Sequence, residues 1–195
     1  MSSNSDLPYP QPATLSPGLR RIHSALTQSS DAEASPFETM LNQRMALLSI
    51  CAMIDRLPLS GPDTLSQLGP ALAAYLRQDF PAIVAEEEEG LLPLLRQRLL
   101  LGDDLEPAIR QLSDEHRRDT QRALSLAAEC DALAEGLDPE DVAGILVSLA
   151  AFAEQQRRHL AWEEAIILPV ARARLTEQDL RSWNRAMRAR KRLLS

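Results

Sequence analysis

From Pro36 onward, apolar residues recur every three to four positions, which is the period of a helix with one buried face. Stretches with this period cover about 37–57, 64–101, 103–135 and 139–174, and only short connections separate them. Leucine, alanine, arginine, glutamate and glutamine are common, while aromatic residues make up 4% of the chain. We therefore expect an all-α fold, an up-down-up-down four-helix bundle.

Proline and glycine mark where the expected helices end or bend. Pro58 ends the first helix, and Gly102 and Gly136 follow the second and third. Asp103 is suited to the N-terminus of the third helix. Proline removes a backbone donor, so we expect bends in the second helix at its three prolines, Pro70, Pro81 and Pro93.

The two ends of the chain differ from its middle. Residues 1–35 are rich in serine, proline, glutamine and threonine, which predicts a mobile N-terminal arm, and we expect His23 to be a residue of this arm and no ligand. Thr176, with Asp179 three places on, is a capping box for a short basic C-terminal helix. The sequence thus predicts three parts, which are a flexible arm (1–35), a bundle (36–175) and a short basic helix (176–195).

Charge, cysteines and hydropathy narrow the class of protein. The net charge of −7 argues against nonspecific nucleic-acid binding, and we interpret the basic run 181–192 as the solvated face of a helix. Cys51 and Cys130 lack a C-x-x-C spacing and occupy apolar helix positions, as free core cysteines do. No stretch resembles a secretory signal or approaches the roughly 20 apolar residues of a membrane span. We expect a cytoplasmic protein with no membrane partner, and the sequence carries no signal for an oligomeric state.

Two segments, one in the second helix and one in the fourth, follow the same template. The first contains Ile83, Glu87 and Pro93, and the second contains His159, Glu163 and Pro169. Residues four apart share one helix face, one turn from each other. The second segment therefore directs an imidazole and a carboxylate to one point, as helical bundles do at metal sites. In the first segment, isoleucine stands in place of the histidine.

The inward faces of the four expected helices are apolar except at one level. The polar residues at that level are Arg44, Glu87, His116, His159 and Glu163. Burying isolated carboxylates is costly, so they require a cation or a dense hydrogen-bond network. Two imidazoles and two carboxylates can form a ligand shell for iron, manganese or zinc. Of the four consecutive glutamates 86–89, we expect only Glu87 to turn inward and the other three to face solvent.

Three motifs give the chain its resemblance to the hemerythrin family, specifically the bacterial cation-binding (HHE) members. They are Glu87-Glu88-Glu89-Gly90-Leu91-Leu92-Pro93, Leu112-Ser113-Asp114-Glu115-His116 and His159-Leu160-Ala161-Trp162-Glu163. The resemblance covers about 36–175 and implies a metal-binding helical bundle. It also implies a set of metal ligands, which are Glu87, His116, His159 and Glu163.

Two ligand positions of the family are replaced in this chain. Ile83 stands where the second helix of the family carries a histidine, and Arg44 stands where the first helix does, although Asn42 or Gln43 would fit with a small shift. The two missing histidines serve the same iron in the family, so the resemblance implies one retained ion and one lost. Our hypothesis is that the Arg44 guanidinium replaces the lost charge and pairs with Glu87, while Ile83 fills the space.

These observations leave more than one function open. The resemblance implies one bound ion, iron before manganese or zinc, in a protein that senses or buffers iron, dioxygen, nitric oxide or peroxide. The alternative is a metal-free bundle with a structural or regulatory role, in which Arg44 and protonated imidazoles neutralise the buried glutamates. An enzyme is less favoured, because the sequence shows no separate nucleophile, acid–base pair or substrate-binding motif.

Overall fold

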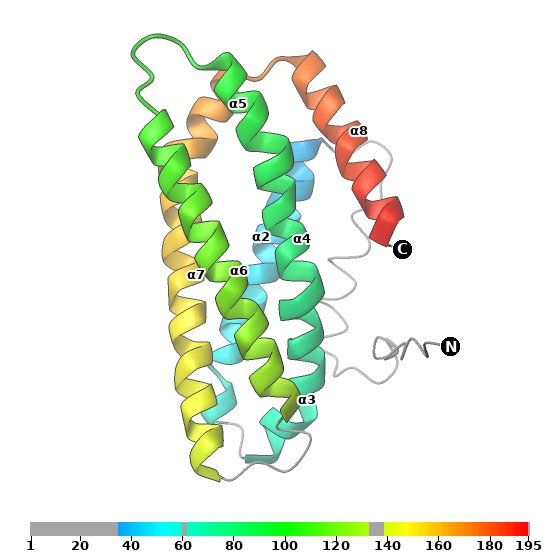
Figure 1. Ribbon diagram of the computed structural model, residues 1–195, viewed down its shortest axis with the longest axis vertical. Coiled ribbons are helices and arrows are strands. Elements are labelled where there is room, and N and C mark those ends of the chain that lie inside the picture. Colours follow the sequence, from blue (N-terminus) through cyan, green and yellow to red (C-terminus); the bar gives the residue numbers. More distant parts are fainter. Residues whose placement is uncertain (1–34, 60–61, 133–138, 195) are drawn as a thin grey trace, which may run out of the picture.

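The computed structural model describes residues 35–59, 62–132 and 139–194, which form helices and their connections with no strand among them. Figure 1 shows the long helical rods of the bundle side by side, with successive rods antiparallel. They are α2 (Pro36–Ile54), a composite second rod, α6 (Glu106–Ala132) and α7 (Pro139–Arg174), and a short helix η2 (Leu57–Leu59) follows α2. A further helix, α8 (Glu177–Leu194), lies beside the second rod. The prediction of an all-helical bundle with a C-terminal helix is confirmed.

The second rod consists of five segments and contains two π-helical turns. Its order is α3 (Pro62–Ala74), η3 (Tyr75–Asp79), α4 (Phe80–Glu86), η4 (Glu87–Leu91) and α5 (Leu92–Arg98). Each π turn ends two residues before a proline, Pro81 or Pro93. A proline ring clashes with the carbonyl four residues earlier, and a wider turn relieves that clash. The irregularities expected at these two prolines are therefore π turns, whereas Pro70 lies inside α3.

The helix ends follow local hydrogen bonding. At the start of α2, Glu38 donates its amide to Ser35 Oγ (3.2 Å) and accepts from the Ser35 amide (2.7 Å), which completes a capping box. The predicted pairing of Thr176 with Asp179 is present at the start of α8. The third rod begins at Glu106, later than expected, because Asp103 accepts from the Leu100 amide instead of capping a helix. The N-terminal arm, His23 and Gly136 lie outside the described residues.

The core consists of two apolar clusters with a polar layer between them. One cluster contains Leu47, Phe80, Ala123 and Phe152, and the other contains Met40, Leu91, Leu112 and Ile167. On each rod, buried polar residues separate the members of the two clusters, and these residues include Arg44, Glu87, His116, Asp119, Gln156, His159 and Glu163. The fold thus holds charged groups midway along the bundle, away from solvent. Both cysteines are free and buried, as predicted.

None of the helices in the described residues combines the length and the apolar character needed to cross a bilayer.

Candidate metal centre

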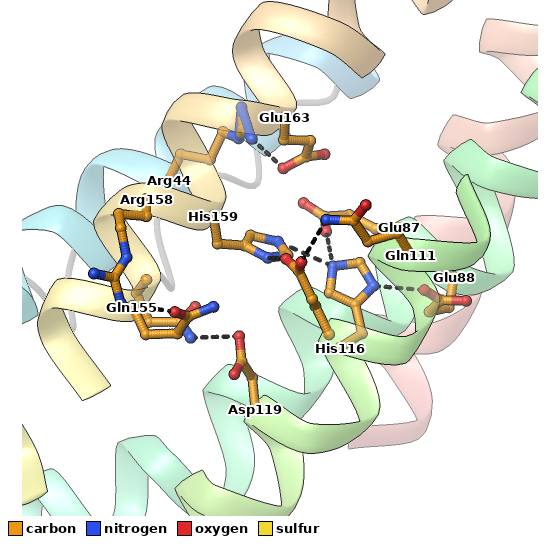
Figure 2. Close-up of polar contacts among 12 residues, drawn as sticks. Arg44, Glu87, Glu88, Gln111, His116, Asp119, Gln155, Arg158, His159 and Glu163 are labelled. Carbon is orange, nitrogen blue, oxygen red and sulfur yellow. Dashed lines mark hydrogen bonds and ion pairs between the residues drawn. The ribbon is translucent and has the colours of Figure 1, made fainter. Parts of the chain in front are cut away.

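Three of the four predicted ligands converge in the polar layer. Glu87 comes from the first residue of η4, His116 from the middle of α6 and His159 from α7. Each offers one ligand atom, and these atoms all lie within 4.8 Å of one another (Figure 2). All three side chains are buried. Among the described residues, these three side chains are the candidate ligands of a metal ion.

The two separations that involve His116 suit a shared ion. His116 Nε2 lies 3.0 Å from Glu87 Oε2 and 3.2 Å from His159 Nε2. Two ligands bound about 2.0–2.2 Å from one ion, at tetrahedral or octahedral angles, are about 2.8–3.6 Å apart. The donor types, two imidazole nitrogens and a carboxylate oxygen, are those of iron, manganese and zinc sites. The residues present therefore fit a transition-metal ion.

Carboxylates on the outer side of each imidazole fix its orientation. Glu88 Oε1 lies 2.5 Å from His116 Nδ1, and the other Glu88 oxygen accepts from Ser113 Oγ at 2.9 Å. Glu115 Oε2 lies 3.3 Å from His159 Nδ1. With each Nδ1 facing a carboxylate, both Nε2 atoms are directed to the centre, as outer carboxylates direct the histidines of metal sites. Sequence reasoning missed Glu88 and Glu115, although both lie within the motifs quoted above.

The two histidines have opposite pKa shifts. Burial disfavours a charged His116, but its hydrogen bonds to Glu87 and Glu88, together with their charges, outweigh burial and raise its pKa to about 10. Burial, followed by the charge of His116, lowers the pKa of His159. In the metal-free protein at neutral pH, His116 is therefore an imidazolium between two carboxylates, and His159 is neutral. A proton on His116 thus occupies the place that an ion would take.

Glu163, the fourth predicted ligand, lies outside this converging group. It is 0% exposed, and its Oε2 accepts from the Arg44 guanidinium, which also reaches Glu164 at 3.3 Å. The hypothesis that Arg44 pairs with Glu87 is wrong, because its partners are Glu163 and Glu164. The reason is that α2 packs along α7, so the Arg44 side chain meets the carboxylates of α7 first.

This ion pair is not fully satisfied. Glu163 Oε1 and Arg44 Nε have no hydrogen-bond partner in the described structure. Burial and the nearby charge of Glu87 raise the pKa of Glu163, and the Arg44 charge opposes them. Because water does not reach this buried pair, Arg44 and Glu163 stabilise each other's charges, and removing Arg44 leaves Glu163 unpaired.

The other residues of this level have clear positions. Ile83 is buried one turn before Glu87 and offers no ligand atom. Of the alternatives on the first helix, Asn42 is exposed and Gln43 is half-buried, so Arg44 is the α2 residue of the polar layer. Gln156 donates to Asp119 Oδ2 at 2.8 Å below the histidines. Sequence reasoning missed Asp119, which is buried three residues after His116.

The expectation that three of the glutamates 86–89 face solvent is also wrong. Glu89 is exposed, but Glu88 is half-buried against His116 and Glu86 is buried. Glu88 lies in the π turn that begins at Glu87, and the extra residue of that turn changes which side chains face inward. Glu86 precedes the turn and is buried because Arg190 of α8 covers it. The run therefore distributes its carboxylates to both sides of the helix.

Comparison with known proteins agrees with this geometry. The family model of the hemerythrin HHE cation-binding domain matches residues 19–171, which include every residue of the polar layer. No curated protein and no solved structure gives a significant match. The matched range extends from before α2 almost to the end of α7, and it stops short of α8. The chain therefore belongs to the hemerythrin HHE cation-binding domain family.

Proposed function

We propose that this protein binds a single iron ion through Glu87, His116 and His159. The observation that supports it most is the convergence of these three buried ligand atoms within 4.8 Å. Two histidines and one carboxylate are the ligand set of many non-haem iron sites, in which other coordination positions stay open. Glu163 is a ligand in the family pattern, but here Arg44 holds it, so we propose three protein ligands in place of four.

Open coordination positions would let the ion bind small molecules. Three protein ligands on a six-coordinate iron leave room for water, dioxygen, nitric oxide or peroxide. We propose that the protein senses or buffers iron or one of these molecules. Reversible dioxygen carriage in the family uses two irons, and the position of the second is taken by Arg44 and Ile83, so carriage is not what we propose.

Metal content tests the ligand assignment. Protein purified without chelator, or loaded afterwards with ferrous iron under anaerobic conditions, is expected to hold about one ion per chain by elemental analysis. His159→Gln and His116→Gln are expected to lower this to less than about a tenth, because each removes one of three ligands. Asp119→Asn is the control, since Asp119 lies in the same polar layer outside the converging group. A parent protein that cannot be loaded with iron, manganese or zinc contradicts the proposal.

A second candidate is a metal-free bundle with a structural or regulatory role. It is favoured by one observation, which is that the His116 imidazolium and Arg44 already give the buried glutamates cationic partners. The two candidates differ in how heat stability responds to metal. A ligand bound only by the native state, at about 1,000 times its Kd, adds about 4 kcal/mol and raises Tm by on the order of 10 °C in a chain of this size. An unchanged Tm with iron, manganese or zinc supports the metal-free candidate.

Metal binding is expected to release a proton from His116. Its pKa of about 10 means that it is protonated at pH 7, and an ion needs the neutral Nε2. Affinity for metal is therefore expected to rise about tenfold per pH unit below pH 10, since a proton competes with the ion there. Calorimetric titration at pH 7 in two buffers that differ in ionisation enthalpy measures the released proton. Heats that do not depend on the buffer contradict this prediction.

A further inference from the structure

The C-terminal helix α8 contacts the outer side of the turn that carries Glu87. Arg190 binds Glu86 with two nitrogens, Nε to Oε1 at 3.1 Å and Nη2 to Oε2 at 2.5 Å, and its third nitrogen lies 3.7 Å from Glu89. Figure 1 shows α8 running alongside α4 and α5, where η4 joins them. The hemerythrin match ends at residue 171, so it assigns no role to this helix.

A second contact holds the same turn from the same side. Gly90, the fourth residue of η4, lies directly under the indole of Trp183. A Cβ built on Gly90 would be 2.6 Å from Trp183 Cδ1 and closer still to Nε1, so only a glycine fits without displacing the ring. Trp183 is itself fixed, since it is buried and meets the ring of Phe37 edge-on, with 5.5 Å between centroids.

The far end of α8 is anchored away from the metal centre. Asp179, in the first turn of α8, accepts from Arg98 Nε at 2.9 Å and Nη2 at 3.0 Å. Arg98 is the last residue of α5. The helix is therefore tied to the second rod at its start by one ion pair, and farther along it contacts η4 through Trp183 and Arg190.

These contacts flank the two glutamates that face the histidines. Glu86 and Gly90 are held by α8 on the outside, and between them Glu87 and Glu88 reach His116 on the inside. We propose that α8 is a positioning element of the metal centre, with Trp183 and Arg190 as the positioning residues that hold η4 so that Glu87 and Glu88 meet His116. This inference rests on the proposed function, because it takes Glu87 to be a ligand.

The arrangement couples α8 to the ion. If docking of α8 favours the geometry that binds metal, then bound metal favours docking of α8 to the same degree. A π turn deviates from regular helical hydrogen bonding and can relax to other turns, so holding it from outside has an effect on the side chains it carries. Any partner that draws α8 away from η4 is thereby expected to lower the affinity for metal.

Arg190→Gln tests the proposal, because a positioning role and simple electrostatics predict opposite changes in the affinity for metal. Removing a positive charge near a cation site should strengthen binding if Arg190 acts only through its charge. A positioning role predicts about tenfold weaker binding, the lower end of the effect of altering residues that orient metal ligands. Arg185→Gln is the control, since Arg185 is exposed on the same helix, loses the same charge and contacts Ser182. Affinity for ferrous iron, measured by calorimetry, that is equal or higher in Arg190→Gln overturns the proposal.

Gly90→Ala tests the second contact without changing any charge. The added methyl group must displace Trp183, so binding of ferrous iron is again expected to weaken about tenfold. Gly144→Ala is the matched control, because a Cβ on this helical glycine of α7 meets nothing within 4 Å. Circular dichroism checks that each variant keeps its helix content. Gly90→Ala binding as tightly as Gly144→Ala would count against the proposal.

Hydrogen exchange separates failure of this proposal from failure of the proposed function. In metal-free protein, the amides of Glu87–Leu91 are expected to exchange faster in Arg190→Gln and Gly90→Ala than in their controls. If the parent protein binds no metal but the two variants still exchange faster than their controls, the proposed function is rejected and the role of α8 in holding η4 is retained. Unchanged exchange, together with unchanged affinity in a parent that binds metal, rejects the role of α8 alone.

Discussion

Arg44→Leu is expected to lower the free energy of unfolding of the metal-free protein by about 3–5 kcal/mol, the usual cost of removing one partner of a buried ion pair. Glu163 is 0% exposed, and Arg44 is the residue that donates to its carboxylate. Without the guanidinium, Glu163 must either stay charged in an apolar environment or take up a proton. Both choices cost free energy, and urea unfolding at pH 7 measures the loss.

The pH dependence of this variant has a definite sign. Burial raises the pKa of Glu163, and loss of the Arg44 charge that opposes burial raises it further. A carboxyl group whose pKa is higher in the folded state than in the unfolded state destabilises the fold progressively as pH rises from its unfolded value. The stability lost in Arg44→Leu is therefore expected to be larger at pH 8 than at pH 5. A loss of the same size at both pH values contradicts a buried Glu163 charge as the cause.

The structure offers a matched comparison between the same two helices. Asp55 follows α2 and pairs with Arg157 of α7, but both side chains of this pair reach solvent, with Arg157 32% and Asp55 50% exposed. Arg157→Leu is expected to cost less than about 1 kcal/mol, as exposed pairs do. Adding Glu163→Met to Arg44→Leu should recover most of the loss, because two apolar side chains leave no unpaired charge. A double variant no more stable than Arg44→Leu would show that the loss comes from packing and not from the ion pair.

The fold could be predicted from the sequence because its main signal is local. Apolar residues at helical spacing define the inner face of each rod, and short connections make neighbouring rods antiparallel. The same spacing also places Arg44, His116 and His159 at one level along the bundle. Periodicity gives the level of a residue, but it does not give its partner on another helix. Arg44 was therefore placed correctly and paired wrongly, with Glu87 instead of Glu163.

Residues near a π turn are harder to predict, for a geometric reason. A turn with one extra residue advances the phase of the helix, so a count at 3.6 residues per turn assigns the wrong faces beyond it. Glu88, inside the π turn, was expected in solvent and instead meets His116. Glu86 precedes that turn and is buried because Arg190 of α8 covers it, a contact between distant segments that helix periodicity does not predict. The available signal was Pro93, which marks where the second rod departs from regular geometry. The carboxylates of this run thus face two sides of the second rod, one toward His116 and one toward Arg190.

The double variant Arg44→His, Ile83→His is expected to raise the metal content from the one ion per chain that we propose to two. Ile83 is buried one turn before Glu87, so a histidine there shares the Glu87 face, and Arg44 lies on Glu163. The double substitution supplies two imidazoles and frees Glu163 from its guanidinium partner. The resemblance to the family implies that these two histidines would serve one iron, with glutamates at the positions of Glu87 and Glu163 able to bridge to the other.

The single variant Ile83→His is the informative control for this change. It adds one imidazole but leaves the Arg44 charge on Glu163, and that charge opposes a second cation at close range in a buried site. We therefore expect one ion per chain in Ile83→His and two in the double variant, by elemental analysis after anaerobic loading with ferrous iron. Two ions in the single variant would show that Ile83 alone excludes the second ion. One ion in a folded double variant would show that Arg44 and Ile83 are not what excludes a second ion.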